Sequence, residues 1–231
     1  MLDIGTLLVH PFAMAARTIR GRQGEARRSD GIETRNLLMD AAEELFAELG
    51  VEGASIRSIN AAAGLAPAAV HYHFGSKDRL IAAVIARRGA AVQARSAELL
   101  GEVEASAHPT ALDVVKALAE PFIELLERDH VTGRRWLQIV GEMVLVRDER
   151  VEQVGFGPGS PEVRFERVMV ALHPALPKAY VLAQWRTATT ALIQLLGHAP
   201  VVRRAELDDI VRFVAEGLDG VCRAREANAR Q

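Results

Sequence analysis

The sequence is poor in the side chains on which disulfide-linked, metal-binding and membrane-spanning proteins depend. Its 231 residues include a single cysteine, and aromatic residues make up only 5% of the chain. A lone cysteine excludes an internal disulfide and a cysteine-based zinc site, and it fits a reducing compartment. No apolar run reaches the roughly 20 residues that a membrane helix needs. We therefore expect a cytoplasmic protein without a membrane partner.

A strong net charge is also missing. The formal net charge is -2, so any contact with nucleic acid has to come from local basic residues rather than from a global field. Hydrophobic residues make up 49% of the chain and charged residues 25%, as in soluble globular proteins. Alanine, leucine and valine carry the apolar content, and no segment of useful length alternates as a strand does. These features predict an all-α fold.

Motifs for catalysis, metals and cofactors are absent as well. The seven histidines do not form the H-x-x-x-H or H-E-x-x-H spacing on a helix, and no G-x-S-x-G or Walker A run occurs. The Gly/Pro-rich segment Gly155–Pro161 does not follow a predicted strand, which favours a loop over a phosphate-binding cradle. The sequence therefore predicts no enzyme, no cofactor and no metal site.

What is present is a succession of helical patterns separated by glycine and proline. Residues 1–29 end in an arginine-rich stretch, and we expect them to form a flexible arm, with Met14 as an alternative start. Asp30 and Glu33 resemble a capping box at the start of the first helix. Further helices are expected at about 78–103, 110–129, 133–147, 161–172, 177–197 and 206–225.

The segment Ser55–Lys77 predicts two short helices joined by a tight turn. Ser55 is a favourable N-cap, and Gly64 suits the left-handed residue that ends a helix. A second helix can begin at Pro67 and end at Gly75, after which Ser76 caps the next helix. This order of helix, turn and helix is the helix-turn-helix plan, in which the second helix enters the DNA major groove. A helical hairpin without a DNA-binding role is the alternative.

The region from Glu33 to about Ile85 resembles the DNA-binding domain of TetR-family transcriptional repressors. The resemblance is carried by TR at Thr34–Arg35, AAEELFAELGVEGAS at Ala41–Ser55, IRSINAAAGLA at Ile56–Ala66 and VHYHFGSKDRL at Val70–Leu80. Two positions depart from the usual pattern. Ala66 replaces a Ser or Thr cap, and His71 stands where a phosphate-binding Tyr is common.

We predict a DNA-binding domain at 30–77, with its helix-turn-helix at about 55–74, followed by a larger helical domain at 78–231. Small residues at the start of the second helix allow close approach to bases, and hydroxyl, imidazole and cationic groups around it suit phosphates. The predicted contacts to double-stranded operator DNA are Thr34, Ser55, Arg57, Pro67, Ala68, Ala69, His71, Tyr72, His73 and Lys77.

The larger domain supplies candidate ligand-binding residues. The resemblance implies that it binds a small-molecule effector, whose identity the sequence does not reveal. The large apolar side chains and one carboxylate available for this are Phe122, Trp136, Glu142, Met143, Phe165 and Trp185. The alternatives are that the aromatic side chains form ordinary core and that Glu142 is a solvent-exposed residue at the helix edge.

The last two predicted helices have the features of an interface. Helix 206–225 carries a stripe formed by Leu207, Val211, Val214, Leu218 and Val221, and helix 177–197 is rich in small residues. The chain's own core could cover this stripe, whereas the resemblance implies a homodimer through both helices. We therefore predict a ligand-responsive transcriptional repressor. The alternative is an all-helical ligand-binding carrier or enzyme whose N-terminal head mediates protein contacts.

Overall fold

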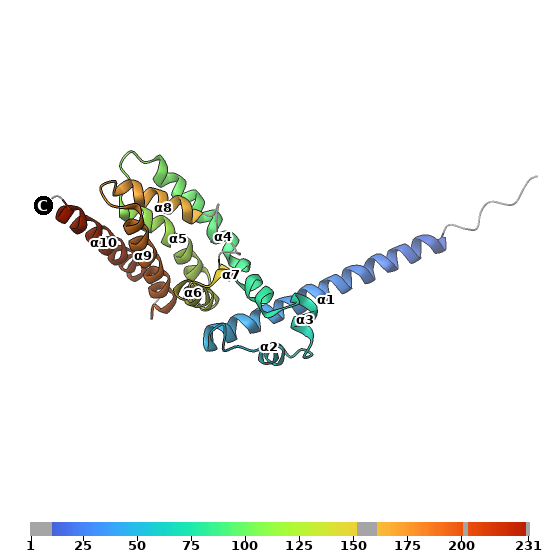
Figure 1. Cartoon of the computed structure of the whole chain (residues 1–231). Coiled ribbons are helices and arrows are strands. Elements are labelled where there is room, and N and C mark those ends of the chain that lie inside the picture. The colour runs from blue at the N-terminus through green and yellow to red at the C-terminus, as the bar shows by residue number, and fades with distance from the viewer. Residues whose placement is uncertain (1–10, 152–160, 201–202, 230–231) are drawn as a thin grey trace, which may run out of the picture.

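The computed structural model describes residues 11–151, 161–200 and 203–229, which form a small head and a larger helical domain (Figure 1). The head consists of the second half of α1 (Pro11–Leu49), α2 (Ile56–Ala62) and α3 (Ala69–Phe74). The larger domain begins with α4 (Lys77–Ala105), which starts beside α3 and continues into the second domain. The Gly/Pro-rich segment at 155–160 lies outside the described residues.

The first helix starts much earlier than we expected. The predicted capping box at Asp30 does not form, because α1 is continuous from Pro11 and the Asp30 carbonyl accepts a hydrogen bond from Thr34 Oγ1 inside the helix. No proline follows Pro11 before Pro67, and a proline is well tolerated in the first turn. The arginine-rich segment 11–29 is therefore a helical extension of the head, which projects away from the rest of the molecule (Figure 1).

The caps of the helix-turn-helix agree with the sequence at most positions. Ser55 caps α2 and exchanges hydrogen bonds with Ser58, while Gly64 and Gly75 have φ values of 66° and 82°. Both glycines therefore occupy the left-handed region that the sequence assigned to them. The second helix begins at Ala69 rather than at Pro67, because residues 67–68 form a turn and Ala68 provides no side-chain cap.

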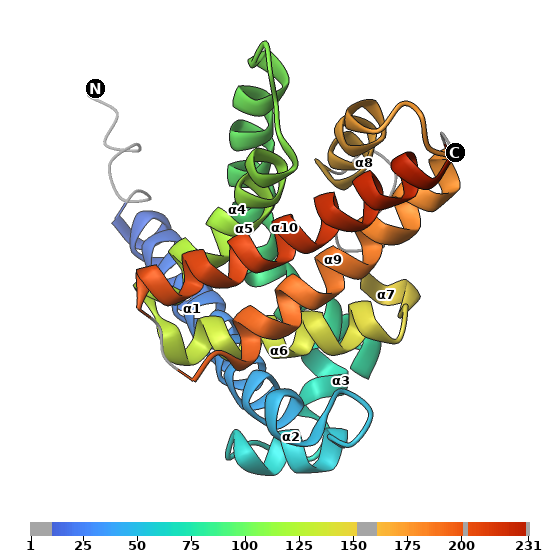
Figure 2. The ribbon, with the colours of Figure 1, turned by 90° about the vertical axis from the view of Figure 1, so that its left-hand side faces the viewer.

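The remaining helices complete the larger domain. They are α5 (Ala111–Arg128), α6 (His130–Leu145), α7 (Glu149–Val151), α8 (Pro161–Leu172), α9 (Lys178–His198) and α10 (Arg204–Ala229). The predicted break at Thr132–Gly133 is wrong, because Asp129 caps α6 and Gly133 lies in its first turn. Figure 2 shows α9 and α10 side by side along one face of the domain.

The predicted apolar stripe on α10 packs inside its own chain. Leu207, Val211, Val214 and Leu218 are buried, whereas Val221 is exposed. The stripe is covered because α10 packs against both α5 and α9. An interface between two copies would therefore have to use another face of α10.

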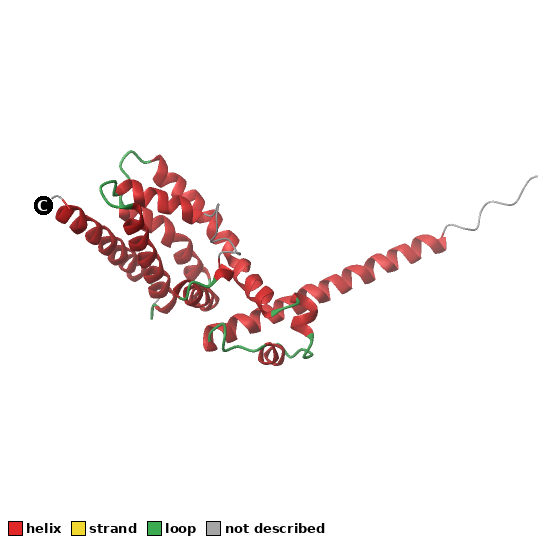
Figure 3. Cartoon of the chain, viewed as in Figure 1, coloured by secondary structure: helices red, strands yellow, loops and turns green. Residues whose placement is uncertain are grey.

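The described residues contain helices and no strand (Figure 3), which confirms the all-α fold class. One continuous core runs from Leu38 and Phe46 in the head to Trp136 and Trp185 in the larger domain. Within the described ranges, no helix is long and apolar enough to cross a membrane. The same ranges contain no group of three or more histidine, cysteine or acidic side chains arranged to hold a metal ion.

Candidate DNA-binding surface and its joint to the helical domain

A buried asparagine fixes the position of α3 relative to α2. Asn60 is 2% exposed, its Nδ2 donates to the Pro67 carbonyl at 2.6 Å, and its Oδ1 accepts from the Val70 backbone N–H at 3.1 Å. One side chain thereby satisfies a donor and an acceptor on both sides of the point where α3 begins. Our sequence analysis missed Asn60, although an asparagine inside a helix has low intrinsic propensity and indicates a specific partner.

The outer surface of α3 carries side chains that the core leaves free. Tyr72 is 85% exposed, and its ring meets that of His73 edge to face with centroids 5.0 Å apart. His71 is exposed and its Nδ1 lies 3.1 Å from the Gly75 carbonyl, so this nitrogen carries the proton and donates. The neighbouring Ala68 is exposed as well. This part of the head therefore presents Tyr72, His71 and the small Ala68 to its surroundings, whereas the predicted contact His73 is partly buried.

The buried side of α3 is held by α1. Arg35 Nη1 donates to the His73 carbonyl at 2.8 Å, and the guanidinium lies 4.1 Å from the centroid of the Phe74 ring. Arg35 therefore joins the end of α3 to α1 through a hydrogen bond and a cation–π contact. Thr34 is partly buried, and its hydroxyl is occupied within α1 by the Asp30 carbonyl.

The other predicted DNA contacts differ in solvent exposure. Arg57, on the first turn of α2, is exposed, and so are Ser55 and Pro67. Ala69 is partly buried against the core of the head. Together with the exposed part of α3, the exposed side chains form what we name the α2–α3 surface, consisting of Ser55, Arg57, Pro67, Ala68, His71 and Tyr72.

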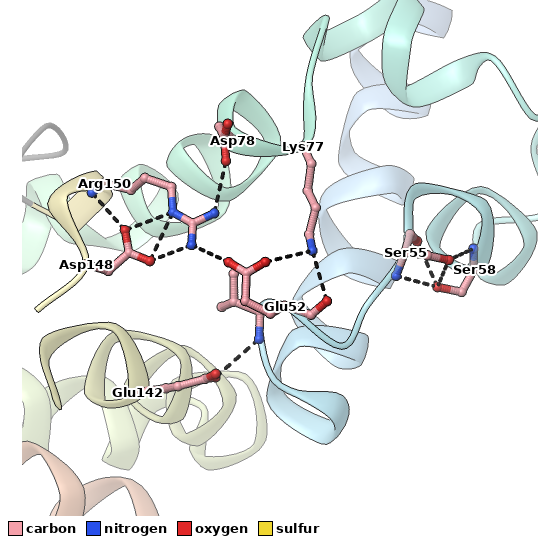
Figure 4. A network of polar contacts seen from close by, with 9 residues as sticks. Glu52, Ser55, Ser58, Lys77, Asp78, Glu142, Asp148 and Arg150 are labelled. Atoms are coloured by element: carbon pink, nitrogen blue, oxygen red, sulfur yellow. Dashed lines mark hydrogen bonds and ion pairs between the residues drawn. The ribbon is translucent and has the colours of Figure 1, made fainter. Parts of the chain in front are cut away.

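Lys77 lies in a second polar cluster, which connects the head to the larger domain (Figure 4). Its Nζ is 3.3 Å from the Glu52 carbonyl oxygen and 3.9 Å from Glu52 Oε2, in the loop between α1 and α2. To reach a DNA phosphate, Lys77 would have to give up this contact. The structure therefore assigns it a structural partner that the sequence did not reveal.

Arg150 is the centre of that cluster. Its Nη2 donates to Glu52 at 2.6 Å, its Nη1 donates to Asp78 at 2.9 Å, and its Nε donates to Asp148 at 2.8 Å (Figure 4). Hydrogen bonds to Asp148, and then to Glu52 and Asp78, raise the pKa of the Arg150 guanidinium above its usual value. A permanently charged residue on α7 thus holds the loop between α1 and α2 and the first turn of α4 together.

Glu142 belongs to the same connection rather than to a ligand site. Its Oε2 accepts a hydrogen bond from the Val51 backbone N–H at 3.2 Å (Figure 4). Gly50, the residue after α1, has a φ of 77°, and a Cβ there would lie 3.0 Å from Glu142 Oε1, so a side chain would be strained and would press on the carboxylate. The carboxylate of Glu142, which we predicted to bind a ligand, is thus directed from α6 to the head. We name Glu52, Lys77, Asp78, Glu142, Asp148 and Arg150 the joint.

The other predicted ligand-binding residues form part of the core. Phe122, Trp136, Met143, Phe165 and Trp185 are each no more than 2% exposed. They include two aromatic pairs, Phe122 with Trp136 at 6.4 Å and Phe165 with Trp185 at 5.9 Å between centroids. Two pockets in the described part of the chain, one beside α1 and α6 and one beside α10, are lined by other residues.

One of these aromatic pairs lies next to polar atoms that lack a partner. Trp136 Nε1 donates to the Ile85 carbonyl at 3.0 Å, which satisfies that indole. In contrast, Trp185 Nε1 and Thr189 Oγ1, one turn apart on α9, are buried and find no hydrogen-bond partner among the described residues. Buried polar groups are normally satisfied, so this part of the core is where a polar ligand or a water molecule would be accommodated.

Comparison with known proteins matches the head most clearly. Residues 38–84 match the family described as "Bacterial regulatory proteins, tetR family". An "HTH-type transcriptional repressor AcnR" from Corynebacterium diphtheriae is 30% identical over 128 residues, which are 52% of this chain and 66% of that protein. The "HTH-type transcriptional regulator UidR" of Escherichia coli is 38% identical over 52 residues, 22% of this chain and 26% of that protein. The matched segments thus cover less than two thirds of either relative.

Solved structures extend the similarity to the fold of the larger domain. A TetR-like transcriptional regulator from Rhodococcus has a TM-score of 0.53 at 19% identity, covering 81% of this chain and 96% of that one. The ketosteroid transcriptional regulator KstR2 of Mycobacterium tuberculosis has a TM-score of 0.55 at 18% identity, covering 79% and 93%. Residues 38–84 therefore match the tetR family of bacterial regulatory proteins, and the whole chain has the fold of TetR-like regulators.

Proposed function

We propose that this protein is a transcriptional repressor that binds double-stranded operator DNA through the α2–α3 surface. The observation that carries the proposal is the exposed face of α3, where Tyr72 and His71 are directed to solvent although Asn60 and Arg35 anchor the same helix. Helix α3 is anchored to α1 and α2, and it exposes the large aromatic side chain of Tyr72 to solvent. This combination is suited to contact with a partner. The relatives named AcnR are described as repressors, which supports the same role here.

The surface offers both kinds of contact that a DNA-binding helix requires. The exposed Ala68 allows close approach and can contact a thymine methyl group. Because Nδ1 of His71 is engaged with the Gly75 carbonyl, its Nε2 is the ring nitrogen available to hydrogen-bond to a base. Arg57 on α2 supplies a cation for a phosphate. A regulator of this kind works in the bacterial cytoplasm, where the chromosome is.

A charge substitution on the surface tests this role directly. We expect Ala68→Glu to abolish binding to DNA from upstream of the protein's own gene in fluorescence anisotropy, because the carboxylate would face bases and phosphates. The matched control is Ala105→Glu, an exposed alanine at the far end of α4, which should bind as the wild type does. Equal DNA binding by both variants would favour the alternative in which the head contacts proteins.

We further propose that a small-molecule effector binds in the core around Trp185 and Thr189. Their unpartnered N–H and hydroxyl groups can hydrogen-bond to a ligand, and Phe165 stacked on Trp185 provides an apolar wall. Helix α4 and the joint then connect this region with the head. A coupling of roughly 1–3 kcal/mol would weaken DNA binding about 5–150-fold, and DNA would weaken effector binding by the same factor.

The operator-bound form is proposed to be a homodimer that uses the outer faces of α9 and α10. On α10, Phe213 is 72% exposed, and a Cβ added at Gly217 or Gly220 would meet no atom within 4 Å. These residues and Val221 lie on one exposed flank of α10, at i, i+4, i+7 and i+8. On α9, Ala183 and Thr187 are exposed. Small residues on both helices allow close approach of a second copy.

A further inference from the structure

A pocket of about 330 Å³ lies at the end of the larger domain far from the α2–α3 surface. Three segments line it: the start of α5, the end of α8 with the following His173, and the side of α10 that carries Glu216, Asp219 and Glu226. Leu112 and Leu172 provide apolar walls, and His173, Asp219 and Glu226 provide polar groups. The volume is at the lower end of the range for small-molecule sites, roughly 300–1,000 Å³.

His173 is the unusual residue in this pocket, because it is 3% exposed and only half satisfied. Its Nδ1 lies 3.2 Å from Glu226 Oε1, so Nδ1 carries a proton that it donates to the carboxylate. The second ring nitrogen, Nε2, offers a lone pair to a donor when it carries no proton. This atom is buried and finds no hydrogen-bond donor among the described residues. A buried acceptor without a donor indicates that a donor can be bound from outside.

The carboxylate of Asp219 lies close to His173 Nε2 and can accept a hydrogen bond. Asp219 Oδ1 lies 3.9 Å from His173 Nε2, too far for a direct hydrogen bond. A single donor atom placed between them can reach both at normal hydrogen-bond lengths of about 2.9 Å. The other oxygen of Asp219 accepts from Arg223 at 2.7 Å, which holds the carboxylate in place.

The electrostatic surroundings favour a positively charged donor. Three carboxylates, those of Glu216, Asp219 and Glu226, line the pocket against the single cation Arg223. The neighbouring Cys222 is affected by the same charges, since burial, and then Asp219 and Glu226, raise the pKa of its thiol. A neutral hydroxyl could supply the hydrogen bond, but only a cation would also be attracted by the excess negative charge.

We propose that this pocket binds an organic cation: a protonated primary amine attached to a small apolar body. The ammonium group donates to His173 Nε2 and Asp219 Oδ1, and the carbon body packs against Leu112 and Leu172. The site is separate from the effector region around Trp185.

Three ring compounds of the same shape and different charge test the proposal. We would titrate the full-length protein with cyclohexylammonium, cyclohexanol and cyclohexanecarboxylate in a calorimeter. The expected result is binding of the ammonium compound alone, weakened at least about tenfold by Asp219→Asn. The control Asp209→Asn removes an exposed carboxylate from the same helix outside the pocket and should leave the affinity unchanged. Circular dichroism of both variants verifies that they are folded.

A second measurement locates the bound amine. In nitrogen NMR spectra, the Nε2 resonance of His173 should shift when cyclohexylammonium is added, while the exposed His71 in the head should not change. Equal affinity for the alcohol and the ammonium compound would overturn the proposal, because the pocket would then be merely apolar. Absence of binding by all three compounds would also overturn it and would mean that the chain and solvent satisfy His173. Neither result depends on DNA binding.

Discussion

At the scale of single residues, a few polar side chains with specific partners in the head determine where the exposed side chains of α3 point. Asn60 ties α2 to the start of α3, and Arg35 ties the end of α3 to α1. Neither has to touch DNA, yet together they orient Tyr72 and His71. The buried Asn60 side chain would be destabilising without its partners. It therefore fixes one orientation of the helix rather than simply adding stability, and Arg35 supports that orientation from α1.

Replacing Asn60 should loosen α3 selectively. Asn60→Ala leaves the buried Val70 N–H without a partner, which costs about 1–3 kcal/mol, and also removes the donor to the Pro67 carbonyl. We expect faster hydrogen exchange at the Val70 amide, with unchanged exchange in α9. Asn36→Ala, at an exposed position of α1, is the control. Unchanged protection of Val70 in Asn60→Ala would show that Asn60 does not position α3.

At the scale of helices, the joint determines how the head is carried by the larger domain. Arg150 on α7 and Glu142 on α6 both contact the loop that begins at the end of α1, and Arg150 also contacts α4. The partners Glu52 and Asp78 are largely exposed, so each of these ion pairs contributes only roughly 0.2–1 kcal/mol. The joint therefore favours one head orientation, but at an energy small enough for that orientation to change readily.

Removing the central cation of the joint should broaden the range of head positions. Spin labels at Ala62→Cys in the head and Lys116→Cys on α5, with Cys222→Ser, report this distance within one protomer by pulsed electron paramagnetic resonance. We expect Arg150→Met to widen the distance distribution. Arg147→Met changes an exposed arginine nearby and should not. A distribution as narrow as that of the wild type would exclude Arg150 as the residue that holds the head.

The sequence predicted features that depend on neighbouring residues, such as helix caps, but not contacts between residues far apart in the chain. Ser55, Gly64 and Gly75 act on their own backbone, so their roles as caps were predicted correctly. The joint was not predictable, because Arg150 and Glu52 are separated by 98 positions and nothing in the pattern pairs them. The part of α1 that precedes Asp30 was not predicted. The capping signal at Asp30 indicated a helix start there, whereas the helix runs through this residue from Pro11. The contact of Glu142 with the Val51 N–H was likewise not predictable, because the two residues are 91 positions apart.

At the scale of the whole molecule, the burial of the α10 stripe changes where a second copy would bind. Phe213→Glu places a charge on the exposed face, and we expect light scattering to show a monomer at micromolar concentration with unchanged helix content. Val163→Glu, at an exposed apolar position on α8, should remain dimeric. A stable dimer of Phe213→Glu would exclude this face of α10 as the interface.

The central claim is that two copies of the head bind DNA together through their α3 helices. The most direct measurement is selection of binding sites by the wild-type protein from a random library of double-stranded DNA. We predict enrichment of a palindrome, because a symmetric dimer places two α3 helices in successive major grooves, with half-site centres about 34–36 Å apart or a modest distance beyond. Enrichment of no sequence, or of a single half-site without a symmetric partner, would contradict the account.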